Sequence, residues 1–414
     1  MYDWANSAYA TTVMAGFFPL FFKSYYSSGT DVIVSTTHLG IANSLSSLVV
    51  VIMAPLLGAI ADAGSFKKKF LFLFAYLGIL MSLALSMVQQ GEWEMATFIY
   101  ILGNIGFMAS NTFYDSLLPD IAGDKRVDYV SGLGFSLGYL GGGLLFAFNV
   151  FMVQKPELFG LESVSAAIKL SFVSVALWWA FFSLPLIFFV KEPAAKEHRN
   201  LLGNIVAGYR QIIITFKKVS HLKGLLLFLV AYWLYIDGVD TIIRMAVDYA
   251  MAIGFDPNSL ILALLIVQFV GFPATLLFAK LASIWETKKA LYLAIFSYIF
   301  ITLGAALMQE EYQFYILAVA IAMVQGGIQA LSRSYYARMI PPEQAGEFFG
   351  FFNFLGKFAT ILGPLMIGLV ATMSGSSRLG IASVAIFFVV GGLLLYKVDE
   401  KKIAEEVRGS MKHT

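Results

Sequence analysis

The 414-residue chain is 59% hydrophobic and only 13% charged, which excludes a soluble globular protein. It contains no cysteine and only four histidines, so disulfides and thiolate metal sites are excluded and we expect no metal site or other cofactor. The net charge of +2 is informative only through its placement along the chain, and we expect no nucleic-acid partner.

Twelve long apolar stretches follow one another along the chain, and a membrane-spanning helix needs about 20 mostly apolar residues. The apolar runs lack the alternation of a barrel strand, which favours helices. The predicted spans of the first half are residues 3–26, 36–61, 70–88, 95–118, 130–153 and 167–190. Those of the second half are residues 222–253, 259–283, 290–308, 312–339, 347–373 and 379–396. The sequence therefore predicts an all-α polytopic membrane protein with twelve transmembrane helices.

The only long connection lies between the two sets of six spans. We predict an N-terminal half at 1–190, a linker at 191–221, a C-terminal half at 222–396 and a tail at 397–414. Apolar residues within 201–219 follow helical spacing with basic residues between them, which is typical of an amphipathic helix on a membrane surface. This helix is either an interfacial strut or a docking segment.

Basic residues gather on alternate loops. With the N-terminus inside, most of the 28 Lys and Arg residues fall on the cytoplasmic side. Only a few remain on the other side: Lys23, Lys155, Lys169, Arg244 and Arg378. Because basic loops stay in the cytoplasm, this bias predicts a bacterial inner (cell) membrane protein with both termini cytoplasmic.

The two halves resemble each other in corresponding places. YDWANS in span 1 matches IDGVDT in span 7, with polar residues at the same spacing. DSLLPD (115–120) and YARMIPPE (336–343) end spans 4 and 10, and each is followed by two glycines six residues apart. We therefore expect pseudo-symmetric halves, with a substrate site between them.

Specific strings then identify a family resemblance. GAIADAGSFKKK (58–69) is similar to the major facilitator signature of a glycine, an acid four residues later, a second glycine and a basic cluster. Four further strings resemble the vacuole-effluxer-like branch of that superfamily, which includes fungal vacuolar amino-acid exporters. They are YDWANSAYATT (2–12), SGLGFSLGYLGGG (131–143), GGIQALSRS (326–334) and EFFGFFNFLGKF (347–358). The resemblance implies the major facilitator fold, and it favours amino acids as substrates.

Ionisable residues at membrane depth cost roughly 2.5–3.5 kcal/mol each and therefore indicate function. Asp3 and Asn6 in span 1, and Asp237 and Asp240 in span 7, are spaced three apart, so each pair shares a helix face. We expect spans 1 and 7 to line the central cavity, where a buried carboxylate can exchange a proton near neutral pH. The alternatives are binding of a substrate ammonium, a structural ion pair or a helix cap.

Other polar residues at membrane depth are candidates for substrate contact. Arg244 lies two turns beyond Asp237 and binds either a substrate carboxylate or nearby aspartates. Neutral amides can orient a zwitterion, although they also join helices. Lys357 is a partner either for Asp115 or for a substrate acid. These further candidates are Arg244, Gln325, Gln329, Arg333 and Lys357.

Charged residues near the predicted cytoplasmic ends suggest a gate. Asp62 with Lys67, Lys68 and Lys69, and Asp120 with Arg126, are predicted to form salt bridges between loops that hold one access state. Asp115, near the inner end of span 4, is expected to belong to the same gate.

We interpret the chain as a secondary transporter that moves small polar organic solutes by alternating access, with proton coupling as a hypothesis. A drug, lipid or sugar transporter of the same fold and a non-transporting receptor or scaffold are alternatives. The sequence has no Walker motif, so we expect no energy supply from ATP on this chain. We expect no enzymatic activity and no catalytic residue, because an intramembrane enzyme would need a His–Asp–Glu metal cluster, a Ser–His pair or a GxGD-type dyad at membrane depth. His38, the one histidine outside the central loop and the tail, stands at an outer boundary. We expect a monomer whose partners are a small-molecule substrate and the lipid bilayer.

Overall fold

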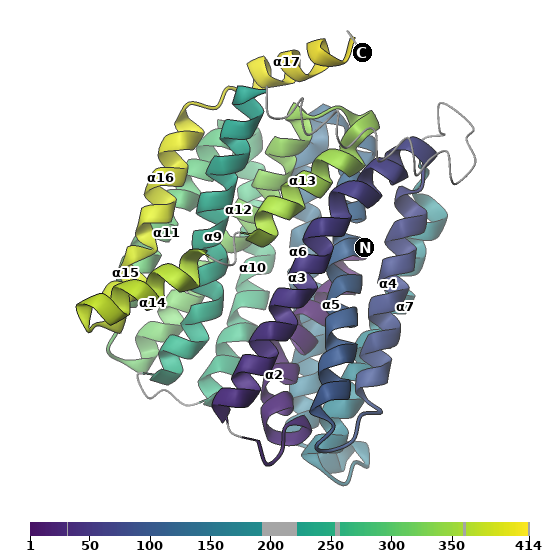
Figure 1. Cartoon of the computed structure of the whole chain (residues 1–414), viewed down its shortest axis with the longest axis vertical. Helices are drawn as coiled ribbons and strands as arrows, with labels where there is room; N and C mark the ends of the chain where they lie inside the picture. The colour runs from purple at the N-terminus through teal and green to yellow at the C-terminus, as the bar shows by residue number, and fades with distance from the viewer. Residues whose placement is uncertain (31, 193–221, 253–256, 359–361, 413–414) are drawn as a thin grey trace.

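The computed structural model describes residues 1–30, 32–192, 222–252, 257–358 and 362–412, and in this part of the chain the regular elements are all helices (Figure 1). The predicted amphipathic helix of the linker lies outside the described residues. The chain begins with α1 (Tyr2–Ala8), η1 (Tyr9–Phe17), α2 (Phe18–Phe21) and η2 (Phe22–Tyr26). The rest of the first half is α3 (Val32–Gly64), α4 (Lys67–Leu85), α5 (Trp93–Ser116), α6 (Leu118–Gln154), η3 (Pro156–Phe159) and α7 (Val164–Phe189).

The second half is built in the same way. Its long helices are α9 (Lys223–Ala252), α10 (Pro257–Trp285), α11 (Thr287–Leu307) and α12 (Glu311–Met339). Shorter elements follow: η4 (Pro342–Gln344), α13 (Ala345–Phe358), α14 (Leu362–Ser374), α15 (Ser377–Ser383), α16 (Ala385–Tyr396) and α17 (Glu400–Lys412). Each predicted span therefore coincides with one helix or with a run of consecutive helices.

Among the described residues, nine helices are long and apolar enough to cross a membrane. The three other predicted spans lie on α1–η2, on α5 and on α13–α14. The first and third of these are divided into short helices, and α5 contains the polar residues Asn104, Asn111 and Asp115. The first of these spans contributes Asp3 and Asn6 to the polar groups discussed below, and α5 contributes Asn111 and Asp115.

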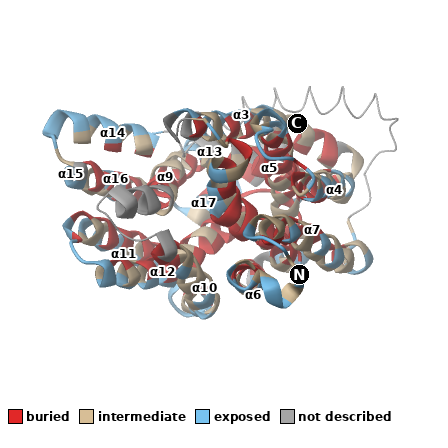
Figure 2. Ribbon diagram, turned by 90° about the horizontal axis from the view of Figure 1, so that it is seen from below, coloured by how far each residue is buried: buried red, intermediate tan, exposed pale blue. Residues whose placement is uncertain are grey.

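Each half has its own apolar core. One cluster of buried side chains runs from Tyr2 to Leu186, and the other runs mainly from Leu222 to Val407. Viewed along the helices, α4, α5, α6 and α7 form one group, and α9–α12 with α14–α16 form another (Figure 2). Burial of apolar side chains stabilises each group internally, and packing between helices must join the two.

Helices pack across the two halves at two main places: α3 packs along α13, and α6 packs along α10 and α12. The first contact is very close. A Cβ atom at Gly58 of α3 would lie 2.3 Å from the main-chain oxygen of Gly346. Glycine is therefore required where α3 meets the start of α13, since no side chain fits there.

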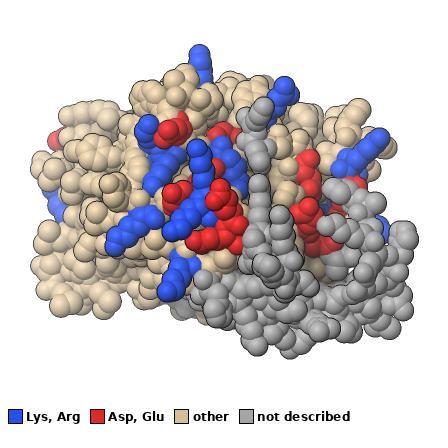
Figure 3. Space-filling view, turned by 90° about the horizontal axis from the view of Figure 1, so that it is seen from above, with Lys and Arg blue, Asp and Glu red and all other residues tan. Residues whose placement is uncertain are grey.

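The two ends of the helix bundle differ in charge. Lys67–Lys69, Lys288, Arg338 and the C-terminal helix α17 all lie at one end, which we call the basic end (Figure 1). Seen from the basic end, Lys and Arg side chains gather with Asp and Glu side chains near the middle of the surface (Figure 3). Most of the surrounding described surface is uncharged. The predicted cytoplasmic loops therefore meet at one end.

Candidate functional site

A cavity of about 480 Å³ lies between the two halves. It is lined by α1, η1, α5 and α6 of the first half and by residues of α9–α15 of the second. Along α12 its wall extends from Phe314 to Arg333, which spans about 28 Å at roughly 1.5 Å per helical residue. The cavity thus runs from the end opposite the basic end to a polar floor.

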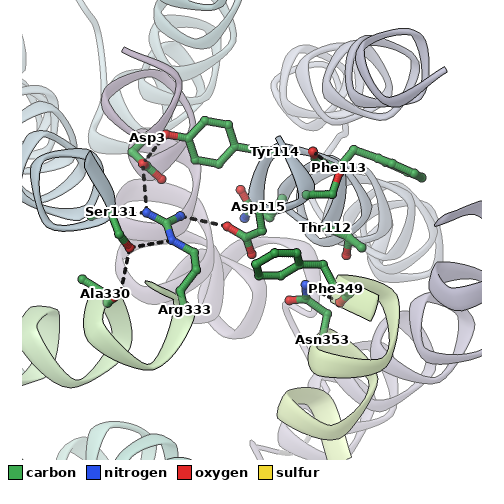
Figure 4. Close-up of polar contacts among 12 residues, drawn as sticks. Asp3, Thr112, Phe113, Tyr114, Asp115, Ser131, Ala330, Arg333, Phe349 and Asn353 are labelled. Atoms are coloured by element: carbon green, nitrogen blue, oxygen red, sulfur yellow. Dashed lines mark hydrogen bonds and ion pairs between the residues drawn. The ribbon is translucent and has the colours of Figure 1, made fainter. Parts of the chain in front are cut away.

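Arg333 is the centre of this floor (Figure 4). Its Nη1 donates to Asp115 Oδ1 at 2.8 Å, its Nε to the hydroxyl of Ser131 at 2.9 Å and its Nη2 to the main-chain oxygen of Ser131 at 3.0 Å. The guanidinium also lies over the ring of Phe135, 4.4 Å from its centroid. A buried cation requires such partners, because its hydration is lost.

Asp3 completes the floor from the first helix. Its Oδ2 accepts a hydrogen bond from the Tyr114 hydroxyl at 2.6 Å and lies 4.0 Å from Arg333 Nη2. A Cβ atom at Gly134 would lie 2.3 Å from that same oxygen, so a glycine is needed at this position of α6 to leave room for the Asp3 carboxylate. Residues from α1, α5, α6 and α12 therefore form one polar cluster, which we call the floor cluster: Asp3, Tyr114, Asp115, Ser131 and Arg333.

The floor cluster has an excess of acid. Asp3 and Asp115 together have two negative charges when ionised, and Arg333 supplies one positive charge. The other described residues of the cavity wall include no further Asp, Glu, Lys or Arg. One uncompensated negative charge therefore faces the cavity when both acids are ionised.

Neutral amides line the cavity above the floor. The Asn6 amide donates to Asn111 Oδ1 at 2.5 Å across α1 and α5, and Gln325 and Gln329 lie on α12 as predicted. Gln268 of α10 also lines the cavity and was missed, although a lone glutamine in an apolar span was the available signal. These groups can donate to or accept from a polar solute without a change in charge.

The remainder of the wall is apolar and comes largely from the second half. Its aliphatic and aromatic side chains include Ile242, Leu260, Ile301, Met308, Phe314 and Ile321. The cavity is therefore amphipathic, with a charged floor and an apolar wall toward the opposite end.

Asp237 and Asp240 do not belong to this wall, so the placement that we expected for them was wrong. Asp237 is fully buried between α9 and α14, where its Oδ1 accepts from the Gly363 amide at 3.1 Å and from the Thr241 hydroxyl at 3.2 Å. The face of α9 toward the cavity bears Ile242 and Ile243. At about 100° per residue, Asp237 lies roughly 120–140° away from them around the helix axis.

Two other predicted residues have side chains outside the described part of the chain, namely Arg244 and Lys357. Lys357 was one possible partner for Asp115, and that alternative lies outside the described side chains; among the described residues, Arg333 forms an ion pair with Asp115. The sequence did not identify this pair, because 218 residues separate its members.

Ion pairs close the basic end at two places. At the first, Lys67 Nζ lies 3.3 Å from Asp62 Oδ1 and 3.1 Å from Asp120 Oδ2. Asp62 also accepts from the main-chain amides of Gly346 and Glu347, at 3.0 and 2.8 Å. We call this group, which joins the α3–α4 turn to the start of α13, the first latch. The predicted Asp62–Lys67 pair is present, whereas Asp120 binds Lys67 rather than Arg126, whose side chain is exposed.

The other two lysines of the basic cluster have separate roles. Lys68 Nζ donates to the main-chain oxygens of Ile187 and Val190, at 3.0 and 2.5 Å, which ties α4 to the end of α7. Lys69 lies over the ring of Phe66, 4.6 Å from its centroid. Neither makes the predicted salt bridge with Asp62 in this arrangement; Lys67 alone does.

The second closure was not predicted. Arg338, at the end of α12, donates from Nη1 to Asp128 Oδ2 of α6 at 2.8 Å and from Nη2 to Asp128 Oδ1 at 3.1 Å. Its Nε lies 2.8 Å from Glu400 Oε1 of α17. Thr287 and Ser334 also donate to Asp128. We call this group, which joins the second half and α17 to α6, the second latch.

Comparison with known proteins agrees with this architecture. The family described as "Vacuole effluxer Atg22 like" matches residues 29–408. The uncharacterized MFS-type transporter YxiO of Bacillus subtilis is 38% identical, over 97% of this chain and 94% of the relative. Autophagy-related protein 22 of Vanderwaltozyma polyspora is 25% identical, over 83% of this chain and 73% of the relative.

Solved structures share the fold. The proton:xylose symporter XylE aligns with a TM-score of 0.69 at 16% identity, covering 99% of this chain and 96% of that one. FucP in its outward conformation aligns with a TM-score of 0.67 at 15% identity, covering 96% and 97%. The chain is an integral membrane protein of the major facilitator fold, and it belongs to the Atg22-like vacuole effluxer family of transporters.

Proposed function

We propose that this protein is a proton-coupled secondary transporter of small polar organic solutes, with amino acids as the favoured class. The observation that supports this most directly is a cavity between the halves whose floor is an acid-rich ion-pair cluster. The cavity wall is formed by both halves, so a rocking movement of one half against the other would change its access. Amino acids are favoured because the chain belongs to the vacuole-effluxer family and resembles the branch that includes fungal vacuolar amino-acid exporters.

The basic end is proposed to face the cytoplasm of a bacterial cell, with both termini on that side. The excess of Lys and Arg in the loops at this end supports the orientation. Both latches lie at the basic end, and the cavity extends away from it. The structure then corresponds to a state closed to the cytoplasm, and the transporter would open inward when both latches separate. Because a single chain forms the entire cavity, we propose that a monomer is sufficient.

Proton coupling is assigned to the floor cluster rather than to Asp237 and Asp240. Asp3 and Asp115 line the cavity and share one guanidinium, so a proton on either acid weakens its attraction to Arg333. Arg333 belongs to the second half, and both acids belong to the first. A change in protonation at the floor cluster therefore alters a contact between the halves, which is what coupling requires.

The test is uptake of labelled amino acids into proteoliposomes, with and without an imposed proton gradient. We expect the gradient to drive accumulation in the unaltered protein, and Asp115→Asn to reduce this to equilibration. Asp237→Asn is the matched control, since it neutralises a buried acid outside the cavity wall. Gradient-driven accumulation that survives Asp115→Asn but is lost in Asp237→Asn would refute the assignment.

A further inference from the structure

The hydrogen bonds of Arg333 restrict what the cavity floor can bind. All three guanidinium nitrogens donate to protein acceptors: Nε and Nη2 to Ser131 and Nη1 to Asp115. Side-chain exposure of Arg333 is only 5%. These hydrogen bonds use three of the five N–H donors of the guanidinium, and a ligand carboxylate that approached the remaining two would lie beside two acids, Asp3 and Asp115. It is a poor match for this floor.

A cation matches the floor much better. Asp3 and Asp115 both line the cavity, and their charge exceeds that of Arg333 by one. A protonated amine brings up to three N–H donors and no acceptor, which complements carboxylate oxygens. Because the site is out of bulk water, an unpaired carboxylate there is costly, and a single positive charge removes that cost.

The rest of the cavity favours an apolar ligand body. Beyond the floor, the wall includes the side chains of Ile242, Leu260, Ile301, Met308 and Phe314. Burial of apolar ligand surface against such a wall is favourable by about 25 cal/mol per Å². The floor and the wall together define an amphipathic ligand with its charged group at the floor.

We propose that the cavity recognises amphipathic primary amines, that it does not require a carboxylate on the ligand, and that the ligand's ammonium and a proton compete for the floor cluster. The floor has one excess negative charge, so it holds either cation but not both. Release of a proton to one side would then accompany binding of the amine, which produces exchange rather than co-transport. This inference rests on the proposed function and specifies the ligand class of the same cavity.

Four compounds with the same isobutyl group separate the charged groups of the ligand: leucine, leucinamide, 3-methylbutylamine and 4-methylpentanoate. Binding to the purified full-length protein in detergent is measured by calorimetry, because neutral amines cross lipid membranes unaided. Proton release is followed with an indicator dye in weak buffer. We expect leucinamide and 3-methylbutylamine to bind at least as tightly as leucine, with release of up to one proton, and 4-methylpentanoate not to bind.

Substitutions at Asp115 and Asp237 test whether amine binding and proton release take place at the floor cluster. Asp115→Asn should weaken amine binding by about tenfold or more and abolish proton release, as expected when a charged hydrogen-bond partner is lost. Asp115→Glu should retain both, and Asp237→Asn should behave like the unaltered protein. If Asp115→Asn does not fold, binding of the four compounds to the unaltered protein still shows whether the cavity requires an amine or a carboxylate on the ligand.

Two results would overturn the inference. If leucine binds while leucinamide and 3-methylbutylamine do not, the site requires a carboxylate, and the proposed amino-acid transport stands without the inference. If the amines bind without any proton release, competition with a proton is wrong. Absence of gradient-driven flux for every amino acid would instead refute the proposed function itself.

Discussion

Lys68 and Lys288 occupy equivalent positions in the two halves. Each is the second residue of the third spanning helix of its half, α4 or α11. Lys68 Nζ donates to main-chain oxygens at the end of α7, and Lys288 Nζ donates to those of Tyr396 and Val398 at the end of α16, at 3.0 and 2.7 Å. In each half, the same contact ties the third span to the sixth and helps that half to move as one body.

The latches are less symmetric than these internal ties. In the first, Asp62 of the first half holds main-chain amides of the second half. In the second, Arg338 of the second half holds a side chain of the first, and α17 adds Glu400. Both must separate before the basic end can open, so each is expected to contribute to the balance between access states.

Gly58 tests the first latch. Replacement by alanine places a Cβ atom 2.3 Å from the Gly346 oxygen, so α3 and α13 must separate. We expect Gly58→Ala to favour a state open at the basic end. The chain has no native cysteine, so Gln329→Cys adds a single reporter thiol in the cavity. Its labelling by an impermeant maleimide from the basic side should rise several-fold in Gly58→Ala. Gly40→Ala, at an exposed helical position of the same α3 where a Cβ atom would meet nothing within 4 Å, controls for loss of a glycine. No rise would contradict the role of this contact.

Asp128 tests the second latch. Asp128→Asn removes the charge that Arg338 binds across the halves, and loss of one member of a partly buried pair costs about 1–3 kcal/mol. We expect the same reporter thiol to become accessible from the basic side. Glu400→Gln should have a smaller effect, because Glu400 and Arg338 both belong to the second half and its tail. Lys289→Ala is the control, since its pair with Glu286 is exposed and local. Equal effects of all three substitutions would contradict the model of a latch.

The spans, the Asp62–Lys67 pair of the first latch and the cavity amides Asn6, Gln325 and Gln329 were predicted, because hydropathy and helical spacing are local properties of the chain. The partners were harder to predict. Spacing places Asp237 three residues from Asp240 but does not say which face of α9 meets the cavity, and that face bears Ile242 and Ile243. Pairs such as Asp115 with Arg333 and Asp128 with Arg338 join distant segments, and only tertiary packing brings them together.

Arg333 tests the floor cluster. Lysine preserves the charge, but its single ammonium cannot reproduce the fork of contacts to Asp115 and Ser131. We expect Arg333→Lys to lower gradient-driven uptake about tenfold or more while the protein remains folded. Arg333→Ala should be destabilising by roughly 3–5 kcal/mol, since it leaves buried acid without a counter-charge. Uptake assays and thermal unfolding in detergent separate the two effects, and unchanged uptake in Arg333→Lys would contradict the assignment.

Asp237 distinguishes a structural acid from a coupling acid. Its Oδ1 accepts from the Gly363 amide in the first turn of α14 and from Thr241, so it joins α9 to the last part of the eleventh span. We expect Asp237→Ala to leave the Gly363 amide without its acceptor, at a cost of about 1–3 kcal/mol in the free energy of unfolding. Asp237→Asn keeps an acceptor oxygen and should unfold at a higher temperature than Asp237→Ala. Both variants, assayed below their unfolding temperatures, should retain accumulation driven by a proton gradient. If Asp237→Asn is as stable as the unaltered protein but no longer accumulates substrate, then Asp237 is a coupling residue, and its distance from the cavity wall must change during the transport cycle.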